Sequence, residues 1–118
     1  MNYAVEDKGK FIKIEINKKT IYLKKDIILS LELMINPGLS NKEKQIRNHD
    51  VYYKYVKSSP EPFSELVIYT SIIDERDQVP VDTIEGRPYS KKYTFRQEGI
   101  QDASELENLM SKIYQYIS

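Results

Sequence analysis

Most of this chain alternates apolar and polar residues with a period of two, and only its C-terminal end changes to the period of a helix. Ile12, Ile14 and Ile16 are separated by Lys13 and Glu15, which is the pattern of a strand with one buried face. A helix would scatter these isoleucines around its circumference. The pattern therefore commits the first part of the chain to β-structure.

Further alternating segments extend this prediction along the chain. Ile21 and Leu23 share one face after the short polar turn at 17–19, which predicts a hairpin. The segment 26–35 also fits a helical stripe, but its longer alternating set favours a strand. Residues 39–50 are polar and predict a loop, with a capping-box pattern that leaves a short helix or turn open. The remaining predicted strands cover residues 51–55, 66–73 and 89–95, with at best an edge strand at 79–81.

The C-terminal segment predicts one amphipathic helix. Its apolar residues recur at spacings of three and four, and Asp102 stands three residues before Glu105 as an N-terminal capping pattern. Such a helix needs an apolar surface, and the open end or exposed face of the sheet provides it. The predicted fold class is α+β, with six or seven antiparallel strands capped by this helix. The apolar stripe consists of Leu106, Leu109, Met110, Ile113 and Ile117.

Length and composition limit the organisation of the chain. We expect a single domain over residues 1–118, with residues 1–9 as a flexible N-terminus, because 118 residues suffice for one core. The chain has no cysteine, so neither a disulfide framework nor a thiolate metal site is expected. It shows no secretory signal and no apolar run of membrane-spanning length. We therefore expect a cytoplasmic protein.

The order of the predicted strands and helix, and their apolar patterns, resemble the pleckstrin-homology-like (PH-like) fold. In that fold two antiparallel sheets form a partly open barrel plugged by a C-terminal helix. The resemblance runs from about Phe11 to Ile117. The resemblance rests on the opening hairpin FIKIEINKKTIYLKKDI and on the passage from 93–96 into the helix at 103–110. These segments are similar to those of small bacterial or phage members of the fold. Lipid-binding members use a longer, basic loop than 17–19, so the resemblance implies a scaffold for protein contacts.

The residue inventory argues against an enzyme and predicts neither a metal site nor a cofactor. A cysteine nucleophile is excluded, and His49, the only histidine, is expected to be a surface residue of a polar loop. One histidine without cysteine cannot form a usual zinc site. The acids at 74–82 lack the spacing of a calcium loop, and the four glycines stand singly rather than in a phosphate-binding loop.

Charge is balanced overall but not locally. A net charge of zero argues against a protein that binds mainly by neutralising nucleic-acid phosphates. Residues 1–25 contain seven lysines and three acids, whereas residues 61–86 contain seven acids and Arg76 alone. This asymmetry could steer an oppositely charged partner.

The tyrosines are the remaining functional clue. In NHDVYYKYVK (48–57), Val51, Tyr53 and Tyr55 occupy one face, which predicts their burial against the core. Base stacking on nucleic acid is the competing interpretation. Tyrosine is also enriched at protein interfaces. The tyrosines predicted to be exposed are Tyr22, Tyr52, Tyr69, Tyr114 and Tyr116.

The leading hypothesis is a non-enzymatic protein-interaction domain, an adaptor or inhibitor of a bacterial or phage protein, with an exposed strand edge or the acidic segment as its contact surface. A homodimer through an open edge is a variant of it. The candidate partner-binding residues are Tyr69, Asp74, Glu75, Asp77, Asp82, Glu85 and Arg87.

Two alternatives stay open. One is a membrane-surface or phosphate-binding module, whose affinity for anionic lipid would fall with salt. The other is a protein that binds single-stranded nucleic acid and is weakened by Tyr52→Ala. The candidate anion-binding residues are Lys18, Lys19, Lys24 and Lys25.

Overall fold

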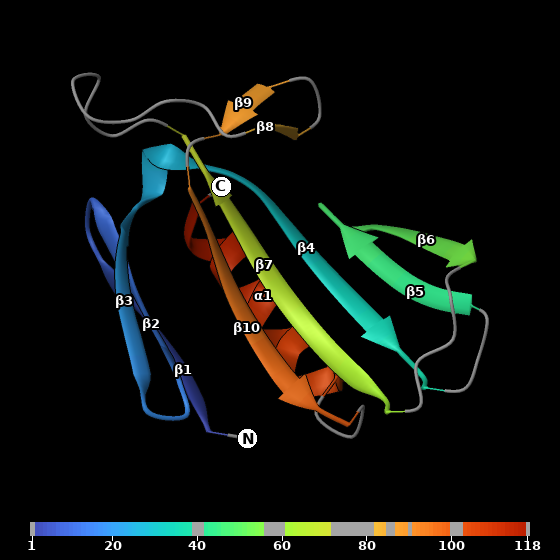
Figure 1. Cartoon of the computed structure of the whole chain (residues 1–118). Helices are drawn as coiled ribbons and strands as arrows, with labels where there is room; N and C mark the ends of the chain where they lie inside the picture. The colour runs from blue at the N-terminus through green and yellow to red at the C-terminus, as the bar shows by residue number, and fades with distance from the viewer. Residues whose placement is uncertain are drawn as a thin grey trace.

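Two antiparallel sheets, a separate two-stranded ribbon and a C-terminal helix form most of the described part of the protein (Figure 1). The computed structural model describes residues 2–38, 42–55, 61–71, 82–84, 87–89, 91–99 and 103–117. The predicted α+β class is confirmed, although the structure holds more strands than the six or seven expected. No helix in the described ranges is long and apolar enough to span a membrane.

The first sheet is a three-stranded meander of β1 (Tyr3–Lys8), β2 (Phe11–Ile16) and β3 (Lys19–Lys24). The predicted β2–β3 hairpin is confirmed, and the three isoleucines of β2 are buried. Strand β1 lies where a flexible N-terminus was expected. It pairs with β2 along its whole length, and its Tyr3 and Val5 pack against the core.

The second sheet has the strand order β10-β7-β4-β5-β6. The prediction of a strand over 26–35 is confirmed from residue 28 onward by β4, whereas residues 26 and 27 belong to a short 3-10 helix, η1 (Lys25–Ile27). The prediction of a strand over 66–73 is confirmed up to residue 70, and residues 72 and 73 lie outside the described ranges. The strands are β4 (Ile28–Asn36), β5 (Lys42–Arg47), β6 (Asp50–Tyr55), β7 (Phe63–Thr70) and β10 (Lys91–Glu98).

One sequence prediction for this part of the chain is wrong, and another is confirmed only in part. Residues 42–47 form strand β5 rather than a loop, because pairing with β4 and β6 on both sides supplies the order that their polar composition does not indicate. The segment 89–95 is divided between β9 (Arg87–Tyr89) and β10. Strand β9 pairs with β8 (Asp82–Ile84) as a separate two-stranded ribbon.

Helix α1 (Ala103–Ile117) closes the core and contacts β1, β4 and β7 (Figure 1). Its predicted apolar stripe is confirmed, because Leu106, Leu109, Met110 and Ile113 are buried. These side chains meet the inner faces of both sheets in one hydrophobic cluster. The helix therefore covers the middle of the second sheet, and strands β5 and β6 extend to one side of it (Figure 1).

Candidate functional site

Strand β6 carries most of the exposed large apolar side chains in the described part of the chain. The exposed fractions are 52% for Val51, 43% for Tyr52, 62% for Tyr53 and 78% for Tyr55. Strand β6 is the last strand of the five-stranded sheet, and no strand within the described ranges pairs with its outer side. We call these four side chains, together with the unpaired side of the strand, the β6 edge surface.

The prediction that Val51, Tyr53 and Tyr55 are buried is wrong, because all three are exposed. Val51 faces Ile46 across the β5–β6 ladder, so all three side chains lie on the face of the sheet that carries the core. Exposure rises along the strand, from Val51 to Tyr55, with distance from the turn. The alternating pattern was interpreted correctly, but α1 does not extend over the outermost strand.

A tight turn anchors the surface at one end. Asn48 and His49 have φ values of 48° and 74°, and a type I′ hairpin turn needs positive φ at both of these positions. The side-chain amide of Asn48 donates to Ser30 Oγ at 3.1 Å and accepts from the backbone N–H of Leu31 at 3.3 Å. These bonds fix the β5–β6 hairpin to β4.

Helix α1 also holds this turn. The Tyr114 hydroxyl donates to Asn48 Oδ1, and the Tyr114 ring lies 4.3 Å from the His49 ring between centroids. His49 is exposed, as predicted for a surface histidine. The turn is thus tied to the core, while the far end of the hairpin extends away from the helix.

A lysine and a shallow groove border the exposed tyrosines. Lys42 Nζ lies 5.2 Å from the ring centroid of Tyr53 and 5.8 Å from that of Tyr55, within cation–π range. The groove has a volume of about 190 Å³. It is lined by Ile35, Pro37, Lys42, Lys44 and Tyr53. The β6 edge surface therefore continues inward as an apolar strip with a basic border.

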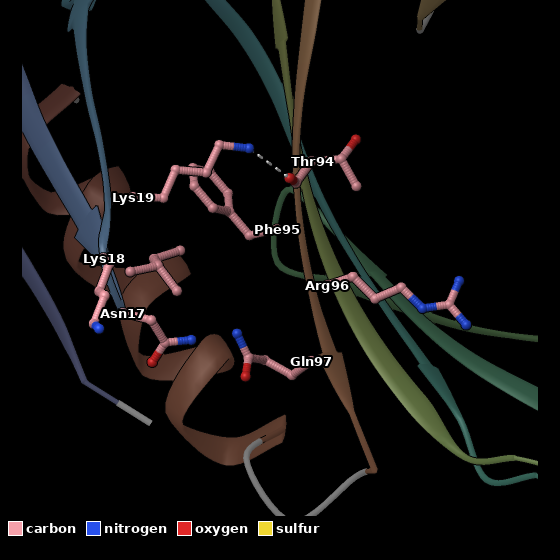
Figure 2. Close-up of a pocket in the computed structure, with 8 residues that line it drawn as sticks. Asn17, Lys18, Lys19, Thr94, Phe95, Arg96 and Gln97 are labelled. Atoms are coloured by element: carbon pink, nitrogen blue, oxygen red, sulfur yellow. Dashed lines mark hydrogen bonds between the residues drawn. The ribbon is translucent and has the colours of Figure 1, made fainter.

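A second concavity lies between the β2–β3 turn and β10 (Figure 2). This cleft has a volume of about 480 Å³, and Phe95 is buried in its wall. Lys19 Nζ donates to the carbonyl oxygen of Thr94 at 3.4 Å and lies 5.0 Å from the centroid of the Phe95 ring. The side chains of Asn17 and Gln97 point toward each other across the cleft (Figure 2). Lys19 thereby covers part of the outer edge of β10.

The four candidate anion-binding lysines do not form one cluster. Lys18 and Lys19 lie at the cleft, whereas Lys24 and Lys25 lie at the other end of β3, beside a groove that Asp26 also lines. Lys25 is paired with Asp7 at 2.7 Å, and the hydrogen bond from Lys25 lowers the pKa of that carboxyl. A six-residue strand separates the two pairs by roughly 17 Å.

The candidate partner-binding residues are mostly beyond the described ranges. Asp74, Glu75, Asp77 and Glu85 lie outside them. The backbones of Asp82 and Arg87 belong to the β8–β9 ribbon. Of the tyrosines predicted to be exposed, Tyr22 and Tyr52 are exposed, whereas Tyr69, Tyr114 and Tyr116 are half-buried.

Tyr69 belongs to a polar cluster that pattern reasoning does not reveal. Its hydroxyl donates to Glu32 Oε1 at 3.4 Å, and its ring meets the Tyr89 ring edge-on at 4.9 Å between centroids. Glu32 is buried and forms an ion pair with Arg47. Glu32, Arg47 and Tyr69 come from three adjacent strands of the second sheet. The cluster locks these strands together on the face opposite α1.

We expect Tyr69 to ionise well above the ordinary pKa of a tyrosine. Burial, followed by the negative charge of Glu32, raises the pKa of Tyr69 from 10.0 to about 12. Because the folded state holds this proton more tightly than the unfolded chain does, the stabilising contribution is complete below pH 10 and is lost as the pH rises to about 12. Tyrosinate absorbance should include a late step at about pH 12 that Tyr69→Phe removes. A Tyr69→Phe protein that keeps the late step would contradict this assignment.

Comparison of the chain with protein-family models, with curated proteins and with solved structures finds no match.

Proposed function

We propose that this chain is a non-enzymatic protein-interaction domain that binds protein through the β6 edge surface. One observation supports the proposal above the others. An edge strand of six residues presents Val51, Tyr52, Tyr53 and Tyr55 to solvent, together with backbone groups that no described strand pairs. Natural edge strands are commonly covered, bulged or interrupted by proline, because an open edge is a template for another strand.

The chemistry of the surface fits protein better than a small ligand. Tyrosine gives a large contact area at a low entropic cost, and clustered exposed apolar side chains mark interaction surfaces. The groove beside Tyr53 is shallow and small for a metabolite, whereas an added strand uses the whole length of β6. An adaptor or an inhibitor of another protein is the activity that such a surface would serve.

A PH-like architecture is part of the same proposal. The support is the arrangement of two antiparallel sheets with the C-terminal helix packed against both. The turn between β2 and β3 contains only Asn17 and Lys18, which is short for a loop that enfolds a phosphorylated headgroup. The scaffold would therefore serve protein contacts.

The test is affinity capture with two differently tagged copies of the chain expressed in its native host. We expect a stoichiometric protein partner with the wild-type chain and loss of that partner with Tyr53→Lys combined with Tyr55→Lys. Both side chains are largely exposed, so these changes alter the surface without opening the core. Intact mass of the eluted proteins identifies the partner or the second tagged copy.

Tyr22→Lys is the matched control, because Tyr22 is 60% exposed on β3, in the other sheet. The control should keep the partner. A third variant, Asp74→Ala with Glu75→Ala and Asp77→Ala, tests the acidic segment as the contact surface. If the β6 variant retains its partner, the proposed surface is wrong. If only lipid or nucleic acid elutes, the alternatives that use Lys18 and Lys19, or Tyr52, replace the proposal.

A further inference from the structure

The backbone direction of β6 determines what could bind its open side. The two-residue turn makes Arg47 and Asp50 the closing hydrogen-bonded pair of the hairpin. From this pair onward, the direction of the backbone N–H and C=O groups alternates along the strand, so Asp50, Tyr52 and Lys54 direct theirs to β5. Val51, Tyr53 and Tyr55 direct theirs outward. The open edge thus offers three residues, each with one donor and one acceptor.

The sequence of β6 is complementary to itself in one antiparallel register. With a twofold axis at Tyr53, this residue faces its own copy, and Val51 faces Tyr55 of the second chain. On the opposite face, Tyr52 meets Lys54 of the second chain. These are aromatic–aromatic, aromatic–β-branched and cation–π pairs, which stabilise neighbouring strands, and no two like charges meet. All three outward-directed residues form ladder pairs.

Neighbouring registers are poorer. An axis at Lys54 places two lysines directly opposite each other, which is destabilising. An axis at Tyr52 pairs Lys54 with Asp50 but places Tyr55 opposite His49, which belongs to the turn. That register loses one of the three ladder pairs.

We propose that the protein bound at the β6 edge surface is a second copy of this chain, paired antiparallel about a twofold axis at Tyr53. This inference rests on the proposed function, because it names the partner of the same surface. The axis stands perpendicular to the sheet, so the two five-stranded sheets join into one and both α1 helices lie on the same face. The two Tyr53 side chains then meet at the axis, and the apolar strips lie on either side of them, over β5 and β4 of each copy.

The expected dimer is reversible. A tyrosine side chain that becomes fully buried contributes 150–250 Å², and those of β6 are already partly covered, so each adds roughly 100 Å². The three tyrosines of each copy together bury on the order of 600 Å², which lies at the low end of interface size, where weak and transient contacts are found. An interface this small is expected to dissociate readily, with dimer at high protein concentration and monomer at low concentration.

Sedimentation velocity over a wide concentration range tests this dimer with the full chain. We expect a monomer–dimer equilibrium that Tyr53→Lys weakens more than tenfold, because it places two like charges at the axis. Tyr22→Lys, at a side chain of similar exposure, should leave the equilibrium unchanged. Circular dichroism melting of each variant verifies folding.

Cysteine cross-linking tests the register, because the natural chain has no cysteine. Under mild oxidation, Tyr53→Cys should form a disulfide-linked dimer. Val51→Cys alone should not, whereas a mixture of Val51→Cys and Tyr55→Cys should. Two thiols lose two electrons and two protons to the added oxidant when each disulfide forms.

The outcomes separate this inference from the function on which it rests. A chain that stays monomeric at every concentration, or a dimer that survives Tyr53→Lys, overturns the inference. If such a chain still captures another protein through Tyr53 and Tyr55, the proposed function stands and only the identity of the partner was wrong. If it captures nothing, both fail.

Discussion

Arg47→Ala should lower the free energy of unfolding by about 3 kcal/mol. Glu32 is 5% exposed, and Arg47 is the cationic partner of its carboxylate. Removing the guanidinium leaves a buried carboxylate whose only described hydrogen bond is the long one from Tyr69. Removing one partner of a buried ion pair lowers the free energy of unfolding, and we expect a loss at the lower end of the usual range because 29% of the Arg47 side chain is exposed. Urea unfolding measures the change.

The matched double variant separates a lost ion pair from lost packing. Glu32 faces Val67 on β7, which is itself buried, so apolar side chains fit this position. Glu32→Leu combined with Arg47→Met should recover most of the loss, since apolar replacement of a buried pair is often neutral. Arg47 Nε is buried without a hydrogen-bond partner, which further limits what the pair contributes. A double variant as unstable as Arg47→Ala would refute this account.

Leu109→Ala should cost about 3 kcal/mol and lower the melting temperature by roughly 10 °C. Leu109 is fully buried at the centre of the α1 stripe, where the helix meets both sheets. The substitution removes transfer free energy and leaves a cavity between elements that cannot close together. Differential scanning calorimetry and urea unfolding measure the two quantities.

Ser111→Ala is the control for Leu109→Ala. Ser111 lies on the exposed side of the same helix, and alanine has the higher helix propensity. We expect the control to be neutral or slightly stabilising. A loss for Leu109→Ala below 1 kcal/mol would show that α1 is not part of the cooperative core.

The local patterns predicted secondary structure where each segment carries its own signal. The isoleucines of β2 and the stripe of α1 bury the faces that their periods indicate. Strand β5 was missed because its sequence is polar although it is paired with a strand on both sides. Its Glu43 is buried beside Asn36 and Gln45 rather than in solvent, so its order comes from its neighbours.

The β6 edge surface illustrates a different kind of error, in which the strand was predicted but its burial was wrong. The alternating pattern correctly placed Val51, Tyr53 and Tyr55 on one face of the strand. Their burial was then predicted from that shared face alone. The structure exposes them because β6 is the outermost strand and α1 covers the middle of the sheet. Strand order is a property of long-range pairing, and no alternation within one strand encodes it.

The sequence by itself determined the α+β class, the apolar faces and the absence of cysteine chemistry, because period and composition act locally. Only the tertiary structure decided which strand stands at the edge, which lysines lie together and that Glu32, Arg47 and Tyr69 meet. These facts depend on contacts between residues distant in the chain. The β6 edge surface exists because one helix cannot cover five strands.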